Sequence, residues 1–253
     1  KREAIETILE FVEDKKVIVM GCLVQRYKEV LDLRLGGGFP HPSYIVVEGD
    51  NGSGKTALIQ QIIYGALSEN LSSLVIITER TTREFLSDAA EIRLDLSSYF
   101  IEGSLRVYTA NLRGLRWGRL TNSKILDILS SFFEEHSTDY DLIVVDSLTH
   151  LIHGVWLGKV LNFFKNLRLL VRRGNTLILT LHPRVLPEDM RAKVVGVSDV
   201  YISLSNIDFG GKNYKALNLI KMKGFNAGAD SSIIFDIDPA IGIKIVPLKA
   251  TKV

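Results

Sequence analysis

The sequence predicts one α/β domain, in which helices flank a mostly parallel central sheet and antiparallel strands are added at the C-terminal end. Three observations predict this class. A strand, a glycine-rich loop and a helix follow one another directly within residues 45–63. Downstream, short apolar and β-branched runs alternate with helical stretches, as they do in parallel sheets. The last part of the chain has strand candidates joined by turns without helices between them, which indicates antiparallel pairing.

The length of 253 residues fits a single large domain. We expect residues 1–253 to form one ATP-binding domain, with an N-terminal helix and lead-in over 1–30 and the core over 31–253. The predicted N-terminal helix is amphipathic, because apolar residues recur in it at helical spacing: Ile5, Ile8, Leu9 and Val12. The sequence leaves open whether this apolar face packs on its own domain or on a neighbour.

The elements of the core are predicted in chain order by hydrophobic pattern and by turn residues. After the strand that begins at Ile45, the predicted parallel strands are 73–79, 105–109, 141–146 and 175–181. Helical stretches separate most of them, at 81–92, 123–135 and 157–173. The helix-free end of the chain holds four further strand candidates, at 199–205, 215–224, 231–238 and 242–248.

Composition limits the classes of function. The net charge of +2 is too small to indicate nucleic acid or an anionic membrane as a partner. Cys22 is the only cysteine, which excludes an intramolecular disulfide and a cysteine zinc cluster and suits a reducing compartment. No apolar run approaches the ~18 residues that a membrane span needs. We therefore expect a cytoplasmic protein without a transmembrane segment.

The pattern Gly49-x-x-x-x-Gly54-Lys55-Thr56 is a P-loop motif between an apolar strand and a helix. Its glycines let the backbone N–H groups face phosphates at the positive end of the helix. Lys55 is expected to reach the β- and γ-phosphates of ATP, and the Thr56 hydroxyl is expected to bind Mg²⁺. An ordinary glycine turn before a helix is the alternative. The predicted nucleotide-binding residues are Gly49, Asp50, Asn51, Gly52, Ser53, Gly54, Lys55, Thr56 and Asp146.

Two acidic residues at strand ends complete the predicted site. Asp146 ends the run "DLIVVD", as expected of a Walker B segment whose carboxylate holds Mg²⁺, so Thr56 and Asp146 are the predicted metal ligands. Glu79 ends the strand after the P-loop helix, where strands reach the ligand crevice. We predict that Glu79 is the catalytic residue that polarises the attacking water. The alternative is a surface glutamate that caps the next helix.

Three other basic features have an open interpretation. Lys221 and Lys223 lie two apart on a strand, so both ammonium groups project from one face. A phosphate of another subunit would explain this pair, and a solvated sheet face is the alternative. His182 ends a central strand and either senses the γ-phosphate or is structural. Three arginines surround Trp117 and indicate either single-stranded nucleic acid or, given the small net charge, a protein contact: Arg113, Arg116 and Arg119.

From about Leu31 to the C-terminus, the chain resembles the KaiC-like form of the RecA superfamily. The resemblance lies in the segments "LDLRLGGGFP", "GDNGSGKT", "VVDSLT", "VSDVYISL", "LIKMKG" and "GIKIVPL". Within that group, "LRVYTANLRGLRW", "LNFFKNLRLLVRRGNTLILTLHP", "PEDMRAKV" and the closing "GIKIVPLKATKV" most resemble the FlaH (ArlH) family of archaellum accessory proteins. The resemblance implies a RecA/KaiC-like P-loop core.

The resemblance also implies partners and a location. Members of this family are single KaiC-like domains that assemble as rings, and we expect a hexamer. They sit at the cytoplasmic base of the archaeal swimming motor, where they contact the motor ATPase FlaI and the membrane platform. The expected location is therefore cytoplasmic and peripheral, at the membrane face, through the motor complex.

The chain departs from hydrolysing KaiC-like domains at two points. Those domains carry two adjacent glutamates where this chain has Glu79-Arg80, and Lys-x-Arg where it has Lys221-x-Lys223. Lysine lacks the planar fork that clamps a phosphate bidentately. Arg80 is expected to pair with Glu79, and an ion-paired carboxylate is a poorer base. We therefore expect strong ATP binding with slow or absent hydrolysis.

The leading hypothesis is an ATP-binding regulatory and assembly subunit of the archaellum motor, with at most slow ATPase activity. An active RecA-type ATPase acting on nucleic acid is disfavoured, because no separate DNA-binding domain and no strongly basic surface is found. A KaiC-type timing kinase is disfavoured because such proteins carry two copies of the domain. Small-molecule phosphotransfer would need a second substrate pocket and a lid, and the sequence predicts neither.

Overall fold

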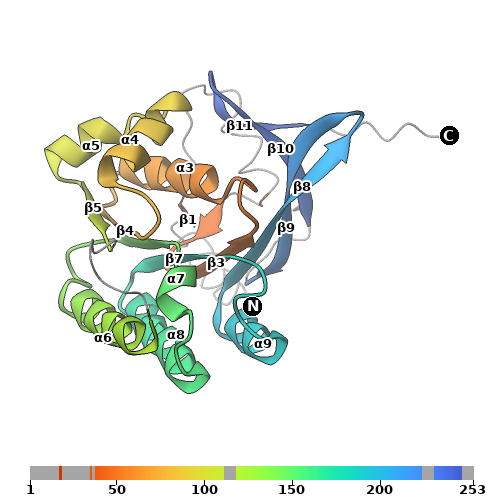
Figure 1. Ribbon diagram of the computed structural model, residues 1–253. Coiled ribbons are helices and arrows are strands. Elements are labelled where there is room, and N and C mark those ends of the chain that lie inside the picture. The colour runs from red at the N-terminus through yellow and green to blue at the C-terminus, as the bar shows by residue number, and fades with distance from the viewer. Residues whose placement is uncertain (1–16, 19–34, 36–37, 111–117, 224–230, 247–253) are drawn as a thin grey trace, which may run out of the picture.

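The computed structural model describes residues 17–18, 35, 38–110, 118–223 and 231–246 (Figure 1). The strands are β1 (Val17–Ile18), β2 (Phe39–Pro40), β3 (Tyr44–Gly49), β4 (Ser73–Ile77), β5 (Leu105–Thr109), β6 (Leu142–Asp146), β7 (Thr176–Leu181), β8 (Val200–Phe209), β9 (Lys212–Met222), β10 (Ser232–Asp238) and β11 (Gly242–Ile245). The helices are α3 (Lys55–Ser68), α4 (Thr82–Glu91), α5 (Leu96–Glu102), α6 (Arg119–Glu135), α7 (Thr149–Ile152), α8 (Leu157–Arg172) and α9 (Glu188–Val197).

Within the described residues, nine strands form the central sheet, in the order β11-β10-β9-β8-β3-β7-β6-β4-β5. The strands from β8 to β5 are parallel, and β9, β10 and β11 are antiparallel additions. The prediction grouped β8 with the antiparallel strands. In the structure β8 pairs parallel to β3 on one side and antiparallel to β9 on the other, so it is the strand at which the sheet changes type.

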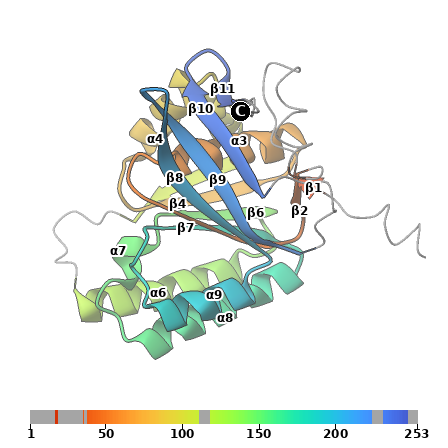
Figure 2. The same cartoon turned by 90° about the vertical axis from the view of Figure 1, so that its right-hand side faces the viewer.

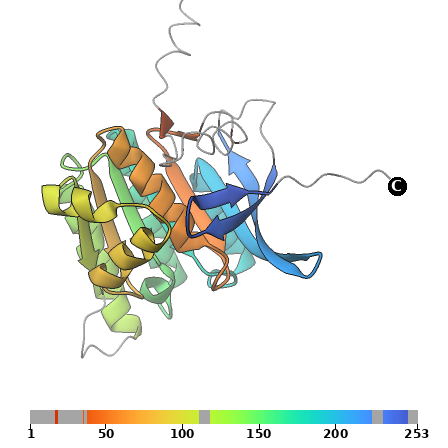
Figure 3. The same cartoon turned by 90° about the horizontal axis from the view of Figure 1, so that it is seen from above.

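Helices cover both faces of the parallel part of the sheet (Figure 2). Alternation along β3 shows how: Ile45 and Val47 belong to the apolar core that includes α3, α4 and α5, while Tyr44 and Val46 belong to the core that includes α6, α8 and α9. Every residue of β3, β4, β6 and β7 is buried, as expected of parallel strands between two helical layers. Seen from above, β10 and β11 lie toward α3, which β11 contacts (Figure 3).

The structure confirms the predicted α/β class and each predicted element of the described core, within a few residues at the ends. Three helices were missed: α5, α7 and α9. The helices α5 and α7, with seven and four residues, have too few turns for a clear apolar periodicity, and α9, with ten residues, buries Met190 and Val194 alone and so lacks a clear apolar stripe. The predicted N-terminal helix, Cys22 and the segment from Arg113 to Trp117 lie outside the described residues. None of the helices in the described part of the chain is long and apolar enough to cross a lipid bilayer.

Candidate nucleotide-binding site

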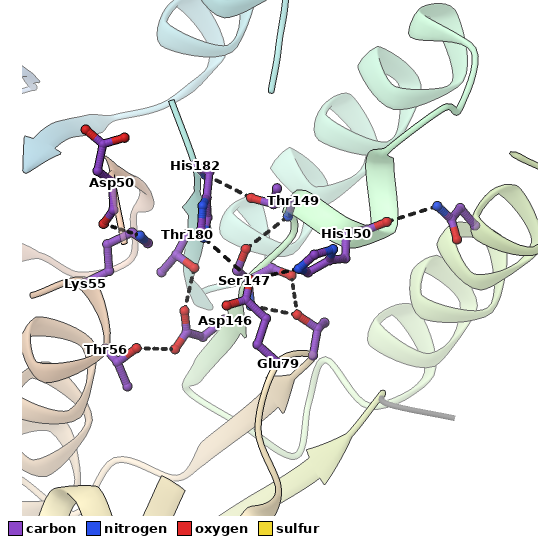
Figure 4. Close-up of polar contacts among 12 residues, drawn as sticks. Asp50, Lys55, Thr56, Glu79, Asp146, Ser147, Thr149, His150, Thr180 and His182 are labelled. Atoms are coloured by element: carbon purple, nitrogen blue, oxygen red, sulfur yellow. Dashed lines mark hydrogen bonds and ion pairs between the residues drawn. The ribbon is translucent and has the colours of Figure 1, made fainter. Parts of the chain in front are cut away.

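The predicted site residues come together where the parallel strands end (Figure 4). The loop of residues 50–54 joins β3 to α3, Glu79 follows β4, Asp146 ends β6, and His182 follows β7. These strands are neighbours in the sheet, so their carboxyl ends meet at one edge. Such an edge is where open α/β sheets bind ligands.

Close packing explains the glycines of the loop. A Cβ atom on Gly49 would lie 2.4 Å from Oγ of Ser53 and 3.0 Å from the carbonyl oxygen of Leu204, too close for any side chain. Gly54 has a φ of +92°, and its Cβ would lie 3.0 Å from the Cδ atom of Lys215. Gly52 has a φ of +73° in open space, so there only the backbone conformation favours glycine. The motif therefore sets a tight loop whose backbone has no side chain at the positions where a ligand would approach it.

The first turn of α3 is available for an anion. Gly54 is the N-cap residue, and no side chain caps the helix there. The first N–H groups of a helix have no partner within the helix, and the helix dipole places partial positive charge on them. Phosphate groups fit this end of α3, as they fit other helix N-termini that follow glycine-rich loops.

The Lys55 ammonium lies across the loop. Its Nζ atom donates to the carbonyl oxygens of Gly49, at 2.6 Å, and of Asp50, at 2.9 Å. Burial lowers the pKa of Lys55, while the carboxylates of Asp146, Glu79 and Asp50 act in the opposite direction. A phosphate would add negative charge beside this ammonium and favour its charged form.

Asp146 is held by two hydroxyl groups. Its Oδ2 atom accepts a hydrogen bond from Thr56, at 3.0 Å, and its Oδ1 atom accepts one from Thr180, at 2.6 Å. Burial raises the pKa of Asp146, and both hydroxyl donors oppose that rise by stabilising the carboxylate. The prediction missed Thr180. The available signal was a polar residue near the end of an otherwise apolar central strand, "TLILTL".

The donor set fits Mg²⁺. A carboxylate and a hydroxyl face each other at 3.0 Å beside the phosphate loop, and Mg²⁺ prefers such hard oxygen ligands. In nucleotide sites Mg²⁺ takes one or two protein ligands and completes its shell with phosphates and water. Thr56 and Asp146 are the residues that would hold the ion. No cluster of three or more His, Cys, Asp or Glu side chains suited to a metal occurs among the described residues.

Glu79 lies between two histidines. Its Oε1 atom is 3.5 Å from Nε2 of His150 and 3.5 Å from Nε2 of His182. The predicted Glu79–Arg80 pair is wrong, because Arg80 forms its ion pair with Asp88 of α4. The helix-cap alternative is also wrong for Glu79. Thr81 caps α4 and forms a capping box with Glu84, so Glu79 remains directed at the site.

His182 is fixed through its backbone. Its N–H donates to Oγ1 of Thr149, at 2.9 Å, which ties the end of β7 to the start of α7. Burial lowers the pKa of His182, and the Lys55 charge lowers it further. The side chain lines the same pocket as Lys55 and Glu79. This position fits either of the two roles that the sequence left open.

The site opens into a pocket of ≈ 240 Å³ between the P-loop and α4. Its lining beyond the predicted residues was not anticipated and is partly apolar: Ala57, Gln60, Ile77, Arg80, Asp88, Ile92, Ser147 and Ile237. Ile92 follows α4, and Ile237 belongs to β10, so strands and helices far apart in sequence build this wall. Hydrophobic spacing marks the isoleucines of this wall as core residues, which is why the sequence did not indicate that they line a pocket.

Lys221 and Lys223 do not join this pocket. Lys221 pairs with Tyr201 near the start of β8, and β8 runs parallel to β3. The two lysines therefore lie at the amino edge of the sheet, whereas the P-loop lies at the carboxyl edge. The six residues of β3 separate these edges by roughly 15–20 Å. A contact of either lysine with phosphate would have to involve a nucleotide on another subunit.

Both lysines also have partners within their own chain. Lys221 Nζ donates to the carbonyl oxygens of Val195, at 2.7 Å, and Gly196, at 2.9 Å, near the end of α9. Lys223 Nζ lies 2.9 Å from Oδ1 of Asp199. Burial opposes the charge of Asp199, but hydrogen bonds from Arg168, Lys223 and the Tyr44 amide outweigh it and lower its pKa. The Lys223 side chain is nevertheless 58% exposed, so the solvated-face alternative stays open beside these contacts.

Comparison with known proteins agrees with the fold and the motif. A family model described as the KaiC ATPase matches residues 24–250. The archaeal flagellar ATP-binding protein FlaH of Sulfolobus acidocaldarius is 40% identical over 222 residues, which are 88% of this chain and 96% of that protein. The crystal structure of the flagellar accessory protein FlaH from Methanocaldococcus jannaschii superposes with a TM-score of 0.76 at 24% identity. That match covers 92% of this chain and 100% of the other.

A short stretch of the chain has a different relative. Over 33 residues it is 73% identical to the ribosomal protein uS12 methylthiotransferase RimO of Aquifex aeolicus. The match covers 13% of this chain and only 8% of that protein, so it carries no statement about function.

Proposed function

Because this chain belongs to the FlaH family of KaiC-like ATPases, we propose that it is an ATP-binding regulatory and assembly subunit of the archaellum motor. The observation that carries the proposal is the meeting of the P-loop lysine, the Thr56–Asp146 pair and Glu79 at one sheet edge. This arrangement supports the binding of a nucleoside triphosphate with Mg²⁺. In the proposed role, the bound nucleotide sets the assembly state of the protein and its affinity for partners.

The parts of the site divide the work of binding ATP. The loop N–H groups, the start of α3 and Lys55 would hold the phosphates, and Thr56 and Asp146 would hold Mg²⁺. Mg²⁺ supplies neutralisation of phosphate charge when it is bound. Glu79, at the end of β4, would orient the attacking water. The apolar wall with Ile92 and Ile237 would cover the less polar part of the nucleotide.

Slow hydrolysis is part of the proposal. Phosphoryl transfer depends on positioning and on stabilising the charge of the γ-phosphoryl oxygens. A trans arginine supplies a factor of roughly 10³–10⁵ in GTPases, and this chain offers Lys223 in place of the arginine. The second acidic residue of hydrolysing relatives is replaced by Arg80, which pairs with Asp88. The residues that bind ATP in its ground state are kept, whereas those that would stabilise the transition state of hydrolysis are weakened.

Ring formation would place a nucleotide at the subunit interface. Lys221 and Lys223 lie at the sheet edge opposite the P-loop, so a head-to-tail arrangement would bring them toward the neighbour's phosphates. A head-to-tail arrangement forms a ring when its rotation closes, and a hexamer is proposed. The proposed partners are the motor ATPase FlaI and the membrane platform. Their contact would locate the protein at the cytoplasmic face of the membrane.

The mass and nucleotide content of the purified protein, measured with and without Mg-ATP, test this function. Light scattering should show a higher mass with Mg-ATP, and the nucleotide should stay bound through gel filtration. Single-turnover hydrolysis with excess protein should be far slower than ~1 s⁻¹, the low end of ordinary enzyme rates. A steady rate near or above that value would instead make the protein an active ATPase.

A further inference from the structure

The contact of Glu79 with two histidines goes beyond the motifs of the sequence. Both Nε2 atoms face the same carboxylate oxygen, Oε1, and each lies 3.5 Å from it (Figure 4). A carboxylate oxygen has two lone pairs. Two imidazoles in their Nε2–H tautomers would each donate a hydrogen bond to one of these lone pairs. The separations exceed an ordinary N–H···O hydrogen bond by about half an ångström, so a small shift closes them.

On the His150 side of Glu79, the helix α7 is held in place by hydrogen bonds from α6. His150 lies on α7, and the Asn122 side chain of α6 donates to the carbonyl oxygens of His150, at 3.0 Å, and His153, at 2.8 Å. Asn122 is only 1% exposed, so this clamp is part of the packed interior. The backbone position of His150 is therefore fixed even though its imidazole is exposed.

The segments that follow β4, β6 and β7 are also joined to each other by hydrogen bonds. The Thr78 hydroxyl, next to Glu79, donates to the carbonyl oxygen of Ser147 at 2.8 Å and accepts from its N–H at 3.1 Å. Ser147 Oγ in turn accepts from the N–H of Thr149, at 3.1 Å. Thr149 Oγ1 holds the N–H of His182, so β4, α7 and β7 form one frame around the Glu79 carboxylate.

We propose that His150, together with His182, is a positioning residue that restrains Glu79 and keeps ATP hydrolysis slow. The proposal rests on the proposed function and concerns the regulation of the same site. A water can be polarised only by a carboxylate lone pair that is free to accept its proton. With both imidazoles on Oε1, only Oε2 is left to accept from a water, and the frame holds the carboxylate in that orientation, which restricts where the water can be polarised. Removal of one imidazole frees the oxygen while the nucleotide-holding residues keep their contacts.

The test is a gain of activity, which damage to the fold does not produce. His150→Ala should raise the single-turnover rate of ATP hydrolysis about three- to tenfold. This factor corresponds to the free energy of one weak hydrogen bond to a charged group, which the variant loses. The affinity for a non-hydrolysable ATP analogue should not change. His150→Gln keeps an amide N–H donor and should stay near the wild-type rate. His153→Ala is the matched control on the same segment, and its rate should equal that of the wild type.

The double variant His150→Ala/Glu79→Gln should fall to the rate of Glu79→Gln alone, because the gain acts through the carboxylate. An unchanged or lower rate in His150→Ala would overturn the restraint, and so would a gain that survives in the double variant. Failure of the proposed function would be seen in the wild type instead, as absent ATP binding, an ATP-independent mass or fast turnover. The two failures are thus distinguishable.

Discussion

Thr180 Oγ1 donates a 2.6 Å hydrogen bond to Oδ1 of Asp146, and both residues are buried. Asp146 would need its charge to hold the proposed Mg²⁺, yet burial raises its pKa. The hydroxyl of Thr180 reaches the carboxylate from β7, while Thr56 reaches it from α3. One carboxylate thus links the P-loop helix to the next strand of the sheet, and its charged form depends in part on Thr180, a donor that the P-loop and Walker B motifs do not include.

Replacement of Thr180 by Val should weaken Mg-ATP binding by roughly tenfold. Valine has a similar shape, so the change removes the hydroxyl donor without opening a cavity. A hydrogen bond to a charged group contributes about 1.5–3 kcal/mol. Its loss favours the protonated form of Asp146, which cannot bind Mg²⁺. Isothermal titration calorimetry with Mg-ATP measures the change.

Thr180→Ser keeps the hydroxyl and is the control for this prediction. It should bind Mg-ATP almost as the wild type does. Binding in EDTA without metal should differ little between Thr180→Val and the wild type. Equal Mg-ATP affinities in the Val and Ser variants would show that the hydroxyl has no role in holding the metal ligand.

Replacement of Lys55 by Ala should reduce ATP affinity by at least ~100-fold, because two or more hydrogen bonds to charged phosphate are lost. The fold should persist, since the ammonium bonds only to the carbonyl oxygens of Gly49 and Asp50. Thermal melting without nucleotide checks this point. Lys165→Ala, on the exposed surface of α8, is the charge-matched control. Unchanged ATP affinity in a folded Lys55→Ala protein would exclude the P-loop assignment.

Replacement of both Lys221 and Lys223 by Ala should remove ATP-promoted oligomerisation and leave ATP binding to the monomer nearly intact. Neither lysine lines the pocket of its own subunit. If they contact a neighbour's nucleotide, ATP stabilises the oligomer by linkage. Light scattering with Mg-ATP measures the mass. The same ATP-dependent mass in the double variant would limit these lysines to their contacts with α9 and Asp199.

The monomer of this double variant needs its own stability measurement. Lys221 bonds to carbonyl oxygens near the end of α9, and Lys223 pairs with Asp199. Some loss of melting temperature is therefore expected from the monomer alone. Asp189→Ala/Lys193→Ala breaks an exposed ion pair of the same helix and serves as a comparison. It should melt close to the wild type, since exposed pairs contribute little.

The nucleotide-free protein should lose stability as the pH falls below about 6.5, the ordinary pKa of histidine. Burial lowers the pKa of His182 in the folded state, and the Lys55 charge lowers it further. The unfolded chain thus binds the proton more readily, so stability is complete above the unfolded pKa and decreases as the pH falls toward the folded one. Urea titrations of the wild type and His182→Gln between pH 7.5 and 5.5 measure this. A wild type that falls no more steeply than the variant would contradict the prediction.

The strands and long helices were predictable because their signals are local. Continuous β-branched runs such as that of β6 can be buried on both faces only in a parallel sheet between helices. The P-loop motif was recognisable because the local backbone conformation requires its glycines, as the positive φ of Gly54 shows. The short helix α7 and the pairing of β8 were not predictable in this way, since both depend on neighbours distant in sequence.

The sequence by itself determined the fold class, the phosphate loop and the identity of the acidic residues at the strand ends. Only the tertiary structure decided what those residues touch. Arg80 follows Glu79 directly in sequence, yet it turns to Asp88, while His150 and His182 approach the carboxylate from two other elements. The physical reason is that adjacent side chains at a strand end point to different sides, whereas the ends of neighbouring strands converge on one edge. Chain order supplies the motif, and strand order supplies its partners.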